Sequence, residues 1–183
     1  MKTRYLVLTA LISALLCIVG PLTIPIPISP VPITLLNLVL CISLYLVEWK
    51  QALLSVFIYL LLGLVGLPVF SSFRGGFSVL AGPTGGYLIG YLFFVLVSGI
   101  LILTFPQKKA WCAIGFIIGL VTLYAFGSIW MSLQMNTSFA KSLLIGVIPY
   151  LPGDIMKILL AVFLGPVFRS RLVKISDTTH DNN

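Results

Sequence analysis

"GYLIGYLFFVLVSGILILTFP", residues 86–106, contains no charged side chain and decides the class of this protein. A membrane-spanning helix needs about 20 predominantly apolar residues, and this stretch supplies them. Breaking the rest of the chain at charges, prolines and glycine clusters gives five more apolar segments, near residues 5–20, 33–48, 51–66, 110–132 and 142–168. The sequence therefore predicts an all-α integral membrane protein with a bundle of six transmembrane helices.

Composition supports this prediction. Apolar residues make up 60% of the chain, charged residues make up 8%, and the mean hydropathy is +1.17. The 183 residues leave no room for a separate catalytic or nucleotide-binding domain beside six spans. We expect one transmembrane substrate-binding domain, residues 1–170, followed by a polar cytoplasmic tail, residues 171–183.

The distribution of basic residues predicts the orientation. With both termini in the cytoplasm, eight basic residues face inward and two, Arg74 and Lys141, face outward. The inward set is Lys2, Arg4, Lys50, Lys108, Lys109, Arg169, Arg171 and Lys174. This bias accounts for most of the net charge of +7, so we expect a multi-pass protein of the cell membrane that binds no nucleic acid.

Two outward connections have unusual composition. "GPLTIPIPISPVPI", residues 20–33, has prolines at positions 21, 25, 27, 30 and 32 and should be extended, either as a lid or as a rigid spacer. The connection at residues 67–90 ends in "GPTGGYLIG". Gly82, Gly85 and Gly86 could present backbone amides to an anion or carbonyl at the start of the next helix, or serve a tight turn and close packing.

Motifs for covalent chemistry and energy coupling are missing from the sequence. There is no GxxxxGK[ST] motif for nucleotide phosphates. Cys17, Cys41 and Cys112 are scattered, and the single histidine, His180, lies in the polar tail, so we expect no metal site and no cofactor. We expect that the chain is not an enzyme.

The segment "YLPGDIMKILLAVFLGPVF", residues 150–168, contains two charged residues that lipid would not tolerate without a reason. Asp154 and Lys157 share one helix face. Each costs about 2.5–3.5 kcal/mol at mid-membrane, and pairing offsets only part of that cost. They are either a structural ion pair, with Asp154 capping the helix after Pro152 and Gly153, or contacts for a polar ligand in an outward-facing pocket. Asn37 also needs a polar partner, which the ligand could supply.

These residues carry a resemblance to a known family. The proline-rich "PVPITL" (30–35), "GPTGGYLIG" (82–90) and "PGDxxK" (152–157), in that order, resemble BioY, the biotin-binding substrate (S) component of energy-coupling factor (ECF) transporters. The resemblance covers essentially the whole chain. It departs from the family pattern at Leu36, where glutamine is usual, and at Phe73 and Arg74, where small residues are usual.

The resemblance implies that the chain captures biotin from outside and delivers it by docking on a separate module, composed of a transmembrane scaffold and two ATPase subunits. It implies that Ala10 and Ala14 form the face of the first helix that meets the scaffold. The alternatives are a stand-alone ion-coupled carrier that uses Asp154 as a proton site, and a membrane enzyme that acts on lipid.

Biotin presents a ureido ring, a thioether ring and a carboxylate. Asp154 suits a ureido N–H, while Lys157 suits the ureido carbonyl or holds Asp154 charged. Adjacent side chains cannot reach both ends of a ligand on the order of 10 Å long. If Asp154 holds the ring, the carboxylate needs the amides of Gly82 to Gly86, the Tyr87 hydroxyl or Arg74; the converse assignment, Lys157 to carboxylate, stays open.

Overall fold

The computed structural model describes residues 2–104 and 109–180. Six helices of 11 to 30 residues form the bundle. They are α1 (Lys2–Val19), α2 (Leu36–Leu46), α3 (Trp49–Leu64), α5 (Gly85–Thr104), α6 (Lys109–Gln134) and α8 (Leu151–His180). The connections hold the strands β1 (Thr23–Ile26) and β2 (Ser29–Thr34), the 3-10 turn η1 (Ser71–Phe73), α4 (Phe77–Leu80) and α7 (Phe139–Gly146).

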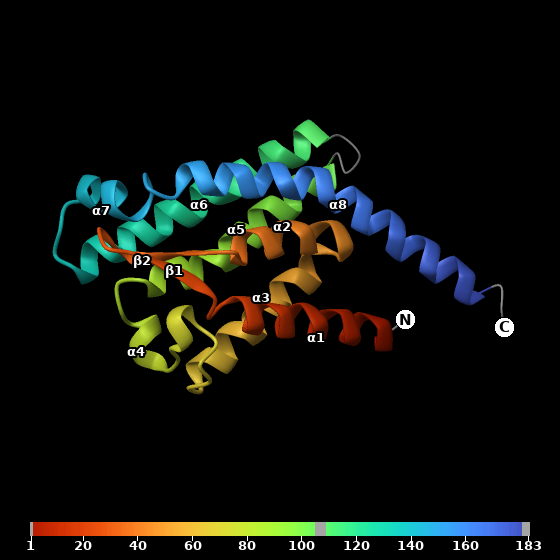
Figure 1. Cartoon of the computed structure of the whole chain (residues 1–183), viewed down its shortest axis with the longest axis horizontal. Helices are drawn as coiled ribbons and strands as arrows, with labels where there is room; N and C mark the ends of the chain where they lie inside the picture. Colours follow the sequence, from red (N-terminus) through yellow and green to blue (C-terminus); the bar gives the residue numbers. More distant parts are fainter. Residues whose placement is uncertain (1, 105–108, 181–183) are drawn as a thin grey trace.

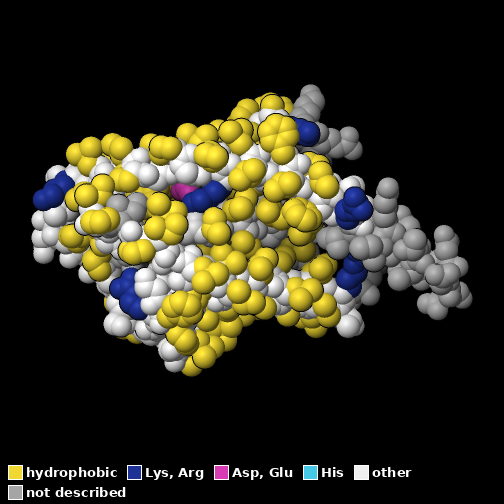
Figure 2. Space-filling model, in the orientation of Figure 1, with side chains coloured by type: hydrophobic (Ala, Val, Ile, Leu, Met, Phe, Trp, Pro, Cys, Tyr) yellow, Lys and Arg dark blue, Asp and Glu magenta, His cyan; other side chains and the backbone are white. Residues whose placement is uncertain are grey.

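The six long helices confirm the predicted all-α membrane bundle. In Figure 1 both termini lie at one end of the bundle, and the hairpin, α4 and α7 lie toward the other. Figure 2 shows hydrophobic side chains covering the middle of one face, with Lys and Arg gathered toward its two ends. In the middle of this face, an acidic side chain touches a basic one. This surface suits a bundle whose sides face lipid and whose ends face water.

Helix lengths depart from simple spanning segments. Among the described residues, three helices are long and apolar enough to cross a membrane alone: Gly85–Ile102, Lys109–Gln134 and Leu151–Arg171. By contrast, α2 rises only about 16 Å, roughly half of a ~30 Å hydrocarbon core. The strand β2 ends at Thr34, directly before α2. Its backbone is paired with β1.

The proline-rich connection is extended, as predicted, but it is also paired with itself. β1 and β2 form an antiparallel hairpin with Thr23 opposite Thr34 and Ile24 opposite Ile33. Among the described residues this hairpin is the only sheet, so both of its strands are edge strands. Proline is tolerated in edge strands because its missing N–H can face away from the partner strand. The sequence predicted the extended backbone and missed the pairing.

The apolar segment 142–168 is not one continuous helix, and the break lies close to the prolines that precede Asp154. The structure divides it into α7, which ends at Gly146, and α8, which begins at Leu151. Pro149 lies between them, where a missing N–H interrupts the helical hydrogen-bond ladder. At its far end α8 continues to His180 without a break at residue 171, so the division into a domain and a tail stays a prediction.

Candidate functional site

The carboxylate of Asp154 lies in the first turn of α8, faces the bundle interior and is 4% exposed. Its Oδ2 accepts hydrogen bonds from Asn37 Nδ2 at 2.9 Å and from the Tyr124 hydroxyl at 2.5 Å. Its Oδ1 accepts one from Lys157 Nζ at 2.7 Å. These partners come from α2, α6 and α8 and are all side chains. The interactions described for this carboxylate are therefore not those of a helix cap.

Lys157 joins the carboxylate to the hairpin. Its Nζ also donates to the backbone carbonyl of Thr34, at 2.7 Å, and its side chain is 12% exposed. The Thr34 hydroxyl lies 3.2 Å from that of Tyr91 on α5. A second tie to the hairpin is the hydroxyl of Tyr150, which donates to the Val31 carbonyl. The end of β2 is thus held against the bundle by groups that a ligand could engage instead.

Asn37 has one polar atom without a partner among the described residues. Its Nδ2 bonds Asp154, but its Oδ1 is buried and accepts no hydrogen bond there. A buried acceptor without a donor costs about 1–3 kcal/mol. This amide oxygen therefore has an unused acceptor position inside the bundle.

One hollow is lined by Asp154, Lys157, Asn37 and Tyr87, four of the residues that the sequence predicts as ligand contacts. The hollow also borders the hairpin at Thr34 and the connection between α3 and α5 at Ser71 and Thr84. Its volume is about 50 Å³. Small-molecule pockets typically measure about 300–1,000 Å³, so this hollow must widen to admit a ligand.

Sequence reasoning missed three tyrosines in this hollow: Tyr91, Tyr124 and Tyr150. Tyr124 bonds Asp154 directly, although 30 residues separate them. Aromatic residues in membrane helices usually pack or anchor at interfaces, and nothing in the sequence distinguishes these tyrosines from the others. The one signal available is that a buried hydroxyl needs a polar partner.

The glycines of "GPTGGY" lie outside the residues that line the hollow. The amide of Gly82 donates to Val79, and that of Gly85 donates to Gly82. A Cβ at Gly85 would lie 1.7 Å from the Leu80 carbonyl oxygen, and one at Gly86 would lie 2.2 Å from Trp130 Cβ. The Gly82 carbonyl accepts from Trp130 Nε1 at 3.0 Å. The structure therefore gives this segment a packing role.

Substituting Gly86 tests that packing role. In Gly86→Ala the new Cβ meets the first side-chain carbon of Trp130, which cannot move without shifting α6, so we expect a loss of about 1–3 kcal/mol in stability. Gly153→Ala is the matched control, because no atom lies within 4 Å of its Cβ. Thermal unfolding in detergent should show a lower Tm for Gly86→Ala only. Equal melting of both variants and the wild type would contradict this reading.

The remaining predicted residues lie apart from the hollow. Arg74 is exposed, and its Nε donates to the Ser71 carbonyl at 3.2 Å, which places it next to a lining residue. Ala10 and Ala14 are exposed on α1. Leu11 and Leu15, beside them, are exposed as well. Within residues 2–104 and 109–180, no cluster of three His, Cys, Asp or Glu side chains could hold a metal.

Comparison with known proteins gives a consistent result. A family model described as the BioY family matches residues 1–174. The biotin transporter BioY of Thermotoga maritima is 36% identical over 164 residues, covering 88% of this chain and 93% of that protein. The biotin transporter BioY of Rhizobium etli is 36% identical over 177 residues, covering 90% and 92%.

A solved structure is also similar. The 2.1 Å crystal structure of the S-component for biotin from an ECF-type ABC transporter matches with a TM-score of 0.83 and 33% identity. The match covers 94% of this chain and 92% of that one.

Proposed function

The chain belongs to the BioY family, and we propose that it is the biotin-binding membrane component of an ATP-driven importer of the ECF type. Its relatives are transporters, and the chain is not an enzyme. The observation that carries the proposal is the buried cluster of Asp154, Lys157 and the unpaired Asn37 oxygen in one hollow. Binding, without covalent change, is the activity.

The ureido ring matches this cluster group for group. It has two N–H donors and one carbonyl acceptor. Asp154 and Asn37 Oδ1 are acceptors for the two N–H groups, and Lys157 Nζ is the donor for the carbonyl. Lys157 would exchange its bond to the Thr34 carbonyl for the bond to biotin. This pose satisfies the otherwise unpaired amide oxygen, which supports it over a purely structural ion pair.

The carboxylate of biotin then points away from Asp154. Ser71 borders the hollow and accepts a hydrogen bond from Arg74 through its carbonyl, so an inward turn of η1 would carry the guanidinium toward the carboxylate. The amides of Gly82 and Gly85 already bond backbone carbonyls, and Gly86 lies outside the lining of the hollow. We therefore favour Arg74 over the glycine-rich segment, with the Tyr87 hydroxyl, 3.3 Å from Ser128, as a second partner.

Entry of biotin requires the hairpin to move. The hollow of about 50 Å³ is several times smaller than an ordinary ligand pocket. The hairpin is held by the Lys157 and Tyr150 bonds to backbone carbonyls. Both are groups that the ligand or water can replace. The proline-rich segment is therefore a lid in this proposal rather than a spacer.

Asn37→Leu tests the role of the amide. This change keeps the approximate shape of the side chain and removes the acceptor for one ureido N–H, so we expect a roughly tenfold weaker Kd, about 1.4 kcal/mol. Ser43→Ala is the control, because Ser43 is a buried α2 residue outside the hollow, bonded to the Leu40 carbonyl. Isothermal titration of purified protein with biotin measures both. An unchanged Kd for Asn37→Leu would remove Asn37 from the site.

Energy coupling is tested by reconstitution. In the proposal, the small side chains of Ala10 and Ala14 on α1 allow a scaffold helix to pack closely against it. Vesicles that contain the chain with an ECF scaffold and its two ATPase subunits should accumulate radiolabelled biotin when ATP is present. Vesicles with the chain alone, under a proton gradient, should bind biotin without accumulating it. Gradient-driven accumulation by the chain alone would favour the ion-coupled carrier instead.

A further inference from the structure

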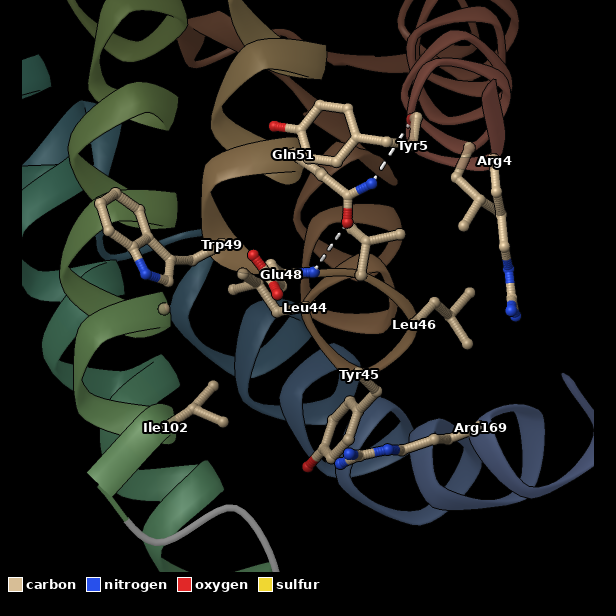
Figure 3. A pocket seen from close by; sticks show the side chains of 13 residues that line it. Arg4, Tyr5, Leu44, Tyr45, Leu46, Glu48, Trp49, Gln51, Ile102 and Arg169 are labelled. Atoms are coloured by element: carbon tan, nitrogen blue, oxygen red, sulfur yellow. Dashed lines mark hydrogen bonds between the residues drawn. The ribbon is translucent and has the colours of Figure 1, made fainter. Parts of the chain in front are cut away.

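A second, larger hollow lies at the end of the bundle that holds both termini. Its volume is about 500 Å³. Arg4 and Tyr5 of α1, the α2–α3 junction and Arg169 of α8 line it (Figure 3). The charge bias of the sequence assigns this end to the cytoplasm. The residues of the biotin site are absent from its lining, so it needs a separate explanation.

The charges around this hollow favour an anion. Figure 3 shows Arg4 of α1 and Arg169 of α8 at two edges of it, with the Arg169 side chain beside Tyr45. The one acid in the lining, Glu48, is the N-cap residue of α3, and its backbone N–H donates to Gln51 Oε1 at 3.2 Å. Lys50, Lys109 and Arg171 add exposed positive charge to the described residues at this end.

The apolar surroundings favour an amphiphile over a free anion. Leu44, Leu46 and Ile102 line the hollow along with the arginines, together with Trp49. Tyr5 also lines a neighbouring groove of about 570 Å³, which is otherwise formed by apolar side chains of α3 and α5 and by Lys50. A phospholipid has an anionic phosphate next to apolar acyl chains. The arginines suit the phosphate, and the apolar and aromatic side chains suit the acyl chains.

We propose that this hollow binds an anionic phospholipid of the cytoplasmic leaflet, with its phosphate between Arg4 and Arg169. Guanidinium groups pair with phosphate oxygens through two parallel N–H···O bonds, which gives a defined headgroup position rather than diffuse attraction. The two arginines lie near opposite ends of the sequence, so the lipid joins α1 to α8. This proposal does not rest on biotin binding.

Native mass spectrometry of the full chain, released from detergent and titrated with phosphatidylglycerol or phosphatidylcholine of equal chain length, tests the proposal. We expect phosphatidylglycerol to bind at least fivefold more tightly. The double variant R4Q/R169Q should lose at least tenfold in phosphatidylglycerol affinity. R171Q, an exposed arginine on α8 outside the lining, should change it less than twofold. R4K/R169K, which retains the charge, should recover part of the loss.

Biotin titration of the same samples separates this proposal from the previous one. R4Q/R169Q should bind biotin as the wild type does, which shows that the variant is folded. Equal binding of the two lipids, or an equal loss in R171Q, would overturn the lipid site in favour of diffuse charge attraction. Full displacement of bound phosphatidylglycerol by excess inorganic phosphate would overturn the lipid site in favour of a site for a free anion.

Discussion

Asp154→Asn is expected to weaken biotin binding by at least 100-fold, the largest effect of any single substitution in the site. The change keeps the shape of the side chain but removes the charge that receives Lys157, Asn37 and Tyr124. A hydrogen bond to a charged group contributes about 1.5–3 kcal/mol, and the buried lysine loses its counter-charge as well. Isothermal titration with biotin at neutral pH measures the loss.

Glu48→Gln is the matched control for that experiment. It removes the same charge with the same change of atoms, but Glu48 caps α3 and does not line the biotin hollow. Its biotin Kd should equal that of the wild type. Size-exclusion profiles and melting curves of Asp154→Asn distinguish lost binding from lost folding. A folded Asp154→Asn protein with wild-type affinity would remove the carboxylate from the ligand site.

Lys157→Met should produce the second-largest loss, at least 30-fold in biotin Kd. Methionine fills much of the same volume but cannot donate to a ureido carbonyl or to the Thr34 carbonyl. It also leaves Asp154 buried without its positive partner, which costs about 3–5 kcal/mol when one side of a buried pair is removed. Titration with biotin and thermal unfolding, run on the same preparation, measure the two consequences.

Two further variants make the lysine result interpretable. Lys141→Met removes the same charge from an exposed position on α7 and should leave both affinity and Tm unchanged. The double variant Asp154→Asn/Lys157→Met should lose less in Tm than the two single variants lose together, because neither charge is then left unpaired. If Lys157→Met alone bound biotin normally, the lysine would be a structural partner of Asp154 only.

Much of the fold could be predicted because the bilayer imposes strong rules. Uninterrupted apolar segments such as 86–106 reveal spanning helices. The rules fail where protein, not lipid, surrounds the backbone. The helix α2 is only 11 residues long and follows β2 directly, and no hydropathy pattern distinguishes that arrangement from one longer helix. Nor does the hairpin follow from five prolines, because its pairing depends on the bundle beneath it.

The charged part of the site could be predicted because a charge in an apolar segment requires an explanation. Asp154, Lys157 and Asn37 stand out for this reason, and the structure brings them into direct contact or within one hollow. Tyr124 could not be found in this way, since a tyrosine in an apolar helix costs little and so gives no warning. The glycines of "GPTGGY" show the converse: they fit a phosphate-like or carbonyl partner in principle, but here Gly86 packs against Trp130.

A crystal structure of the chain with biotin bound tests the central claim most directly, and the quantity to measure is the set of distances from the ureido ring to Asp154, Asn37 and Lys157. We predict N–H···O contacts of about 2.7–3.2 Å to the carboxylate and to Asn37 Oδ1. We also predict that the bond from Lys157 to the Thr34 carbonyl is replaced and the hollow is wider. Biotin bound elsewhere, with the Lys157–Thr34 and Asp154–Asn37 bonds unchanged, would contradict the account.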